Sequence, residues 1–578
     1  MEQYFDYVIV GAGTAGCVLA SRLTQKPTIS VLLLEAGLDF PPGQEPRSIR
    51  DPFPASYGDP QFAWPGLVAE VGPDPGDGGP RFSRPFVQGR MVGGSSSIMG
   101  MMAQRGLPAD FEEWAALGAI GWNWEGVLPY FNRLENDWDF DGPLHGKDGP
   151  IPIRRYSRAD WPAFVLGFAE AIEDEGYPFH DDMNGYFGDC LTKVPMNNRP
   201  DSRVSSAMGY LGADVRRRPN LTIISEATAE RLILEGRRVV GVSANIKGNS
   251  KLFFGGEILV CAGAVHSPAL LMRSGIGPKA ALHRAGVTPV TDRPGVGQNL
   301  FNHAIVHIAV HLPARSQQAK SLTSWAFAML RYSSRRPGCP PGDMQIFPTN
   351  RTSWHPLGRR IGAAGVCLYK PFSTGAVELR SADWRDEPIV KFNLLRDPRD
   401  FERMVDGVRR CCRYLASDRL RGIVNEAFLP PGGQANALNR PSLWNWVKSA
   451  VIAVIFDLPF GVRRRLLGDT VLDLAELAGN PAACAQIVRR VAAAVHHASG
   501  TCRMGRAEDP GAVVDPHCRV YGVEGLRVVD ASIMPTVVSA NTHLCVLMIG
   551  ERVAQLIQDG RRNAMEDTGT RPFAHENR

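Results

Sequence analysis

Short apolar runs separated by glycine-rich turns open the chain. The β-branched run 5–10 predicts a buried parallel strand, and the apolar run 29–34 predicts a second strand beside it. Between the two runs, Val18, Leu19 and Leu23 recur at helical spacing, so residues 14–23 predict a helix with one apolar face. This order of strand, turn, helix and strand is typical of a Rossmann-like unit.

Later patterns predict a second kind of sheet. Residues 301–312 alternate as a strand does, and 365–379 and 388–394 show the pattern of further strands, which suits an antiparallel sheet. Together with the opening unit, this predicts a mixed α/β fold, in which a Rossmann-like domain lies beside a substrate domain built on an antiparallel sheet flanked by helices. At 578 residues the chain is too long for one ordinary core, so two domains are expected.

Two helices are marked by residues at their ends. A strand at 258–262 leads into a helix for which Ser267 is the expected cap, Pro268 the first helical residue and Gly275 the stop. Near the C-terminus, residues 544–557 predict another helix, and Asn541 just before it is a good N-cap.

Composition narrows the class of protein. Apolar content of 44% and charged content of 21% fit a soluble globular protein, and a net charge of +5 without a long basic run argues against nucleic-acid binding. The eleven cysteines include no C-x-x-C pair, which indicates reduced thiols rather than a disulfide framework or a zinc site. No secretory leader and no run of about 18 apolar residues stands out, so we expect a cytoplasmic protein without a transmembrane segment.

The first turn carries a dinucleotide-binding signature. Gly11, Gly13 and Gly16 have G-x-G-x-x-G spacing: the first permits a tight turn, the second lets the backbone approach a pyrophosphate, and the third lets the helix pack on the strand. The helix N-terminus adds partial positive charge for the phosphates. Glu35, at the tip of the second strand, is placed to accept hydrogen bonds from ribose hydroxyls. The motif alone does not separate FAD from NAD.

Three later segments narrow the choice of cofactor. They are the Gly/Ser-rich loop 88–97, the turn and helix 263–277, and the stretch 526–543. With the first motif they resemble the glucose–methanol–choline (GMC) oxidoreductase family, which uses FAD, over residues 5–558. Within that family the chain looks most like the bacterial 5-(hydroxymethyl)furfural oxidase branch, and the stretches that carry this similarity are 105–110, 143–146, 292–297, 392–395 and 521–522.

The resemblance implies how the chain is divided. The FAD-binding domain is expected at 1–155, 206–300 and 490–561, and the substrate domain at 156–205 and 301–489, with a flexible tail at 562–578. Residues 430–479 resemble an insertion relative to shorter members. We interpret it as a lid-like helix packed on its own domain, although its aromatic, apolar and basic order leaves a peripheral membrane contact through 443–465, or an oligomer contact, as alternatives.

The resemblance also implies the residues that hold FAD. They are Gly11, Gly13, Thr14, Ala15, Gly16, Glu35, Ala36, Val92, Gly93, Gly94, Ser95, Met99, Gly100, Ala229, His496, Asp530, Ala531 and Thr542. At one of them the chain departs from the family, because an Asn is usual where Met99 stands. An Asn offers an amide near the flavin ring, whereas Met offers only a weak sulfur acceptor.

Two polar residues are candidates for the chemistry. Alcohol oxidation by hydride transfer requires a base for the hydroxyl proton, and a neutral imidazole suits that role near pH 7. The family's base aligns with His497, and the second His or Asn of the family's pair aligns with Asn541, which could orient the substrate oxygen. If Asn541 also caps the following helix, the positive end of that helix faces the flavin.

Other positions are weaker candidates for the pocket. His496 stands where the furfural-oxidase branch usually has Trp; we interpret it as lining the pocket or touching the flavin, and an imidazole makes the pocket roomier and more polar. Since neighbouring residues in an extended loop point to opposite sides, only one of the two histidines is expected to be the base. Val366, Leu368 and Tyr369 are pocket candidates that serve equally well as core. His543 is expected first to pack at a helix N-terminus.

The sequence does not favour a metal site. His303, His307 and His311 recur at four-residue spacing, but within a strand this spacing places them on one face about 13 Å apart.

The leading hypothesis is an FAD-dependent oxidase of small primary, aromatic or furanic, alcohols that uses O2 and yields H2O2. The alternatives are a quinone- or dye-linked dehydrogenase, a hydroxynitrile lyase and a non-catalytic flavin-binding protein; the oligomeric state is left open.

Overall fold

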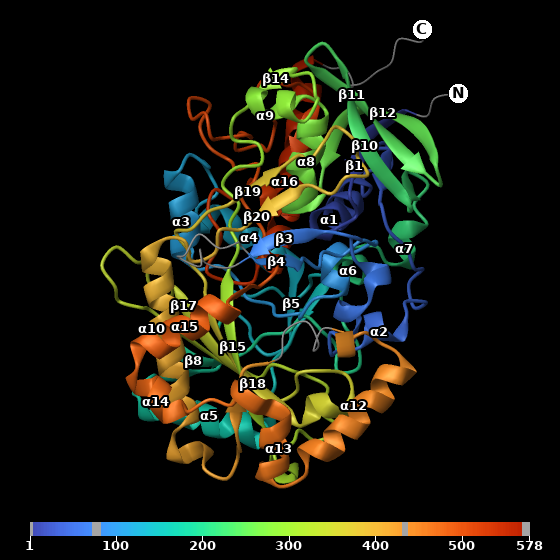
Figure 1. Cartoon of the computed structure of the whole chain (residues 1–578). Coiled ribbons are helices and arrows are strands. Elements are labelled where there is room, and N and C mark those ends of the chain that lie inside the picture. The colour runs from blue at the N-terminus through green and yellow to red at the C-terminus, as the bar shows by residue number, and fades with distance from the viewer. Residues whose placement is uncertain (1–3, 72–81, 431–436, 569–578) are drawn as a thin grey trace.

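The computed structural model describes residues 4–71, 82–430 and 437–568, and its two large sheets form the two halves of the molecule (Figure 1). The first sheet has the strand order β10-β11-β12-β1-β2-β9, with β23 paired to β12. Its β1–β2, β1–β12, β2–β9 and β12–β23 pairs are parallel, whereas β10, β11 and β12 are antiparallel. The strands are β1 (Tyr4–Val10), β2 (Val31–Leu34), β9 (Leu221–Ile224), β10 (Ala227–Glu235), β11 (Arg238–Ile246), β12 (Asn249–Val260) and β23 (Leu526–Val528).

Three helices cover this first sheet. The first, α1 (Thr14–Leu23), has the bounds that the sequence predicts, and it packs on α16 (Thr542–Thr568). The contact is close, because a Cβ on Gly550 of α16 would lie 2.9 Å from Cβ of Val18. α16 continues to Thr568 through part of the segment predicted as a flexible tail, while residues 569–578 lie outside the described part of the chain.

The third helix, α8 (Gly263–Arg273), differs from its prediction. Pro268 lies inside it rather than at its first turn, and the hydroxyl of Ser267 donates to Asp530 instead of capping the helix. A proline cannot donate to the carbonyl four residues earlier. Here the hydroxyl of Thr501 donates to that carbonyl, on Ala264, at 2.7 Å, so the helix tolerates the proline. Gly275, at φ +83°, follows the helix end as predicted.

The second sheet is antiparallel apart from its β7–β8 edge, with the order β21-β15-β18-β17-β16-β8-β7 and β22 paired to β15. Helices α5 (Ala163–Asp174) and α10 (Pro398–Leu415) pack against it, and α15 (Pro481–Val491) packs on α10. The strands are β7 (Phe179–His180), β8 (Cys190–Lys193), β15 (Ala304–His311), β16 (Ala328–Tyr332), β17 (Met344–Thr349), β18 (Ile361–Leu368), β21 (Ala427–Phe428) and β22 (Ala493–Ala494).

The strand patterns at 365–379 and 388–394 divide between two sheets rather than one. β18 belongs to the large antiparallel sheet, whereas β19 (Ala376–Glu378) and β20 (Ile389–Lys391) join β3 (Val68–Val71) and β4 (Phe82–Pro85) in a four-stranded sheet. The reason is the parallel β20–β3 pair, a non-local contact that no local pattern encodes. Ten of the eleven cysteines are buried and the eleventh half-buried, and all are free thiols.

Candidate active site

One cavity of about 1910 Å³ is lined by residues of both large sheets. The ends of β1 and β2 and the start of α1 contribute Val10, Leu34 and Thr14, and the antiparallel sheet contributes Ile305 and Phe347. Loop 94–100 and the segment 491–498 form further walls. The cavity therefore joins the predicted dinucleotide site to the predicted substrate domain.

The first turn forms a cradle that only glycine can make. Gly11 has φ +102°, and a Cβ there would lie 2.6 Å from the carbonyl oxygen of Cys261. α1 begins at Thr14, and its N-cap, Gly13, supplies no side-chain acceptor, so the first N–H groups of the helix have no cap and face the cavity. Such a terminus fits a pyrophosphate.

Glu35 lies at the end of β2 with its carboxylate in the cavity wall. Its two oxygens accept the backbone N–H groups of Ala12 and Gly37, each at 2.9 Å. Burial raises the pKa of Glu35, and these backbone hydrogen bonds oppose that rise. Each oxygen keeps a second lone pair, which fits the ribose hydroxyls of a dinucleotide.

The predicted cofactor residues divide into a lining set and a supporting set. Gly16, Val92 and Gly93 do not line the cavity. A Cβ on Gly16 would lie 2.0 Å from the carbonyl oxygen of Gly11, and Gly93 donates to the carbonyl of Ala12 at 2.8 Å, so these two glycines support the cradle from behind. The others line the cavity: Gly11, Gly13, Thr14, Ala15, Glu35, Ala36, Gly94, Ser95, Met99, Gly100, Ala229, His496, Asp530, Ala531 and Thr542.

Two of the lining residues have additional contacts. Asp530 accepts the N–H of Gly263 at 2.8 Å and the hydroxyl of Ser267 at 2.5 Å, which ties the start of α8 to the C-terminal segment. Met99 packs beside a small apolar cluster that contains Phe62 and Ile98. The thioether therefore gives this wall no amide, as the sequence predicts.

His497 is the centre of a chain of polar contacts. Nδ2 of Asn541 lies 3.1 Å from Nε2 of His497, and Oδ1 of Asn541 accepts the hydroxyl of Tyr369 at 3.0 Å. On the other side of the ring, Nδ1 of His497 lies 2.8 Å from Nδ1 of His303. Because an amide nitrogen only donates, Nε2 of His497 carries a lone pair, and its proton sits on Nδ1, facing His303.

The surroundings keep this imidazole neutral. Burial, together with charge on His496, lowers the pKa of His497 to about 3. Burial also lowers the pKa of His303 well below its ordinary value. The lone pair on Nε2 is consequently available throughout the neutral range, which is the requirement for a general base.

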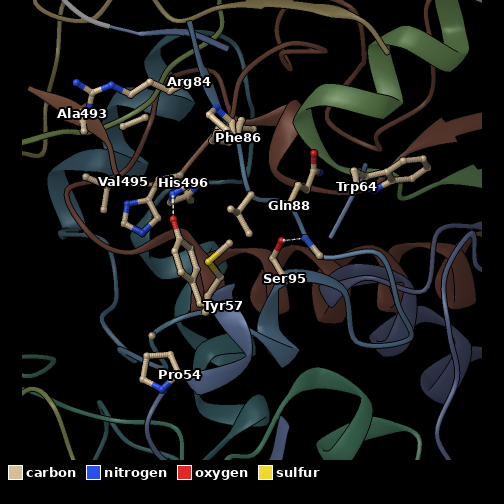
Figure 2. Close-up of a pocket in the computed structure, with 18 of the residues that line it drawn as sticks. Pro54, Tyr57, Trp64, Arg84, Phe86, Gln88, Ser95, Ala493, Val495 and His496 are labelled. Atoms are coloured by element: carbon tan, nitrogen blue, oxygen red, sulfur yellow. Dashed lines mark hydrogen bonds between the residues drawn. The ribbon is translucent and has the colours of Figure 1, made fainter. Parts of the chain in front are cut away.

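His496 has different partners from His497, although both residues line the cavity. Its Nε2 lies 2.7 Å from the hydroxyl of Tyr57, and its ring stacks on Phe86 with centroids 5.0 Å apart (Figure 2). The residue has φ +66°, a conformation that costs energy for any side chain but glycine. Its Nδ1 is buried without a hydrogen-bond partner among the described residues and lines the cavity.

Leu368, a predicted pocket residue, does not line the cavity. It is fully buried in the main core together with Val366, whereas the next residue, Tyr369, reaches Asn541. Tyr369 does not line the cavity either, but its hydroxyl donates to Asn541, which does. His543 lies at the start of α16 with Nδ1 3.3 Å from the hydroxyl of Thr14, in agreement with its predicted role at the helix N-terminus.

His303 is the functional candidate that the sequence argument misses. The four-residue spacing of His303, His307 and His311 raises only the question of a metal, yet each has a different environment: His303 meets His497, His307 lines the cavity, and His311 lies 2.8 Å from Nδ2 of Asn425. Pairing of β22 with β15 brings His303 to His497, since Ala304 lies opposite Ala494. The only local signal is a histidine near the start of the strand predicted at 301–312.

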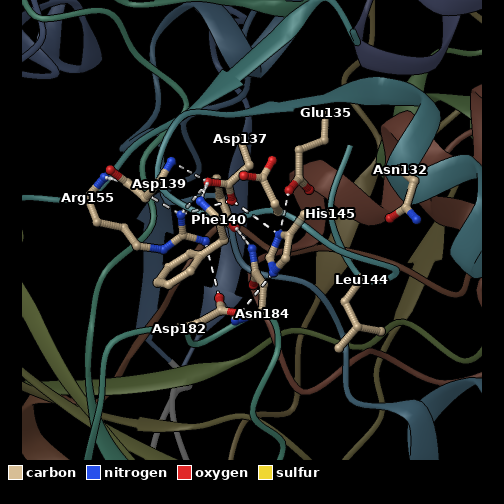
Figure 3. A network of polar contacts seen from close by, with 12 residues as sticks. Asn132, Glu135, Asp137, Asp139, Phe140, Leu144, His145, Arg155, Asp182 and Asn184 are labelled. Carbon is tan, nitrogen blue, oxygen red and sulfur yellow. Dashed lines mark hydrogen bonds and ion pairs between the residues drawn. The ribbon is translucent and has the colours of Figure 1, made fainter. Parts of the chain in front are cut away.

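Glu135, Asp137 and His145 form the one cluster of metal-ligand types among the described residues (Figure 3). Asp137 pairs with Arg155 at 2.9 Å, and Glu135 pairs with Arg105. Carboxylate partners raise the pKa of His145 to about 10 despite its burial, so the ring is protonated and has no lone pair for a metal. We interpret the cluster as an ion-pair network that joins the loops around β5 (Glu135–Asp137) and β6 (Ile151–Ile153).

Comparison with known proteins decides the family. The GMC oxidoreductase N-terminal domain matches residues 5–305, and the C-terminal domain of the same family matches residues 371–550. The chain belongs to the GMC oxidoreductase family. GMC membership identifies the protein as an FAD-dependent oxidoreductase that acts on alcohols, and the uncapped start of α1 and the Glu35 carboxylate fit FAD.

Several GMC relatives cover nearly the whole chain. A 5-(hydroxymethyl)furfural oxidase of Methylovorus sp. is 40% identical over 96% of this chain and 99% of its own length. An oxygen-dependent choline dehydrogenase of Vibrio vulnificus is 32% identical over 96% and 95%. Among solved structures, pyridoxine 4-oxidase from Mesorbium loti superposes with a TM-score of 0.78 at 28% identity, covering 96% and 99%. Over its described residues, this GMC enzyme has no helix long and apolar enough to cross a bilayer.

Proposed function

We propose that this enzyme oxidises primary alcohols that carry an aromatic or furan ring, with His497 as the base and O2 as the electron acceptor. The observation that carries the proposal is the lone pair on Nε2 of His497, 3.1 Å from the amide of Asn541 and in the same cavity as the dinucleotide cradle. Aromatic side chains line this cavity and suit a flat ring: Tyr57, Phe86, Trp325 and Phe347.

The residues would act as follows. The alcohol oxygen lies between the two side chains, where Asn541 donates a hydrogen bond to it and His497 accepts its proton. His303 accepts from Nδ1 of His497 and so fixes the tautomer in which Nε2 is free. Bound FAD supplies the acceptor for the hydride that leaves the carbinol carbon. Overall, one alcohol and one O2 give one aldehyde and one H2O2.

The identity of the substrate rests on the relatives and on one substitution. The 5-(hydroxymethyl)furfural oxidase at 40% identity supports a furanic alcohol. His496, held by Tyr57 and Phe86, stands where that branch usually has Trp. An imidazole is smaller and more polar than an indole, so we expect the pocket to accept ring substituents that an indole would exclude.

A quinone-linked dehydrogenase is the second candidate, because a relative without oxygen in its name, the mitochondrial choline dehydrogenase of Mus musculus, is 32% identical over 98% of this chain. The test is a panel of primary alcohols under air, with H2O2 and flavin absorbance recorded together. Aromatic and furanic alcohols are expected to give stoichiometric H2O2. Flavin bleaching with dye reduction but without H2O2 would overturn the oxidase proposal, and no anaerobic bleaching by any alcohol would favour a lyase.

A further inference from the structure

The outer face of helix α12 (Leu443–Phe456) is apolar although it lies at the molecular surface. With α13 (Phe460–Leu467) it occupies the end of the molecule far from both termini (Figure 1). Large apolar side chains there are strongly exposed: Leu443 80%, Trp444 66%, Val451 59% and Val454 62%. The same surface also exposes Trp446, Val447, Leu458, Phe460 and Val462.

The fold itself does not need this outer face. The inner side of α12 already packs on its own domain, where Ala453 and Phe456 contact a cluster that contains Leu357 and Phe428. This agrees with the predicted lid-like packing, but it leaves a helix that is apolar on both sides. Helices of that kind are normally buried all round. An exposed apolar face of this size marks an interaction surface.

The charges around this face are nearly all positive. Arg440, Lys448, Arg464 and Arg465 are exposed, and the only acidic residue between 437 and 467 is Asp457. Asp457 is paired with Arg360 at 2.6 Å, so it does not offset the exposed cations. The long basic side chains also lie beside the aromatic ones, with Nζ of Lys448 5.4 Å from the centroid of Trp444.

We propose that the outer face of α12 and α13 binds the surface of an anionic phospholipid bilayer. Exposed Trp, Val and Leu suit the boundary between headgroups and acyl chains, and the surrounding Arg and Lys suit anionic headgroups. A second copy of the chain fits less well, because a two-fold axis would place the same cations opposite one another.

Membrane binding of this kind would place the cavity beside the lipid. Asn445, Lys448 and Ile452 of α12 line the cavity, whereas Trp444, Val451 and Val454 do not. The outer residues can therefore be changed without touching the proposed site, so failure of the membrane proposal and failure of the proposed function are distinguishable.

The experiment is co-sedimentation of the FAD-loaded enzyme with vesicles of phosphatidylcholine alone or mixed with phosphatidylglycerol. Binding is expected only to the mixed vesicles and is expected to weaken at high salt. The double variant Trp444→Ser and Val451→Ser should lower the partition coefficient by about tenfold or more. The matched control is Ile120→Ser, an exposed apolar residue outside the face.

A second pair of variants tests the charges. Arg464→Gln with Arg465→Gln should weaken binding to the anionic vesicles, whereas Lys247→Gln with Lys251→Gln, in the exposed turn and strand at β11–β12, should not. Flavin content and thermal midpoint report whether each variant is folded. Absence of binding to anionic vesicles, or binding that the Trp444 and Val451 changes leave intact, would overturn the proposal. A dimer in sedimentation velocity that these changes abolish would assign the face to a second copy instead.

Discussion

Around His497, single hydrogen bonds decide which nitrogen can act. The amide of Asn541 donates toward Nε2, and His303 accepts from Nδ1, so the proton is kept off the nitrogen that faces the cavity. We therefore expect His303 to act as a positioning residue, because it contacts the proposed base rather than the substrate. The contact depends on two segments that are far apart in the chain and are joined by the β15–β22 pair and by further hydrogen bonds, such as the N–H of Val495 to the carbonyl of His303 at 3.1 Å.

The variant His303→Phe tests this role. Loss of a buried hydrogen-bond partner costs about 1–3 kcal/mol, so we expect anaerobic flavin reduction to slow about tenfold to a hundredfold. His303→Gln, which can still accept a hydrogen bond, should retain more of the rate. A slower rate with an unchanged pH profile in both variants would indicate a merely structural role.

The depressed pKa of His497, the proposed base, predicts how the rate constant for flavin reduction depends on pH. Burial lowers the pKa of His497 to about 3, so the ring is already neutral at pH 5. The rate constant for flavin reduction should therefore stay level between about pH 5 and pH 8, since the unperturbed pKa near 6.5 does not apply. A rate that falls as the pH drops through 6.5 would contradict this environment for the base.

At the scale of elements, α8 depends on a hydroxyl from another segment. Pro268 leaves the carbonyl of Ala264 without its helical donor, and Thr501 fills that position at 2.7 Å. Thr501→Val keeps the shape but leaves a buried acceptor unsatisfied, which should destabilise the protein by about 1–3 kcal/mol. Chemical denaturation measures the change, and an unaltered unfolding midpoint would show that the carbonyl finds another donor.

The proposed FAD cradle, the turn between β1 and α1, can be tested by adding a single methyl group. Gly11→Ala would force a Cβ to 2.6 Å from the carbonyl oxygen of Cys261 at φ +102°, so the cradle must move and FAD content should fall severalfold. Gly479→Ala is the control, because a Cβ there meets no atom within 4 Å. Purified protein with full FAD content in both variants would contradict the proposed cradle.

A structural feature can be predicted from the sequence when the residues that cause it lie close together in the chain. The bounds of α1 follow from its own apolar spacing, and the roles of Gly11 and Gly16 follow from backbone geometry alone. The place of Pro268 inside α8, the parallel β20–β3 pair and the contact of His303 with His497 all depend on partners from distant segments. Leu368 lies in the main core instead of the cavity wall, because the alternation of side chains along a strand does not say which of its faces is the core.

Across the whole molecule, buried neutral histidines predict acid sensitivity. Burial lowers the pKa of His497 to about 3, that of His311, His355, His496 and His543 to about 4, and that of His303 well below its ordinary value. Their ordinary pKa in an unfolded chain is near 6.5, so unfolding takes up protons between these values. The stability they confer is complete above about pH 6.5 and is lost as the pH falls toward 4.

His145 contributes to the stability of the protein with the opposite pH dependence. Its pKa is raised to about 10, so its contribution is complete below pH 6.5 and is lost as the pH rises through 10. Since several histidines act on the acid side, each worth about 1.4 kcal/mol per pH unit, the thermal midpoint should fall steeply from pH 7 to pH 5. An equal midpoint at both values would show that these histidines are not buried in the neutral form.

The central claim, that this FAD enzyme uses His497 to remove the proton of an alcohol, is tested most directly by anaerobic stopped-flow reduction of the flavin with one aromatic primary alcohol. His497→Ala should keep its FAD but reduce it about a hundred- to ten-thousandfold more slowly, the usual contribution of a general base. His283→Ala, an exposed histidine on α9 (Lys279–Arg284), should match the unaltered enzyme. Reduction of His497→Ala at the unaltered rate would contradict the account.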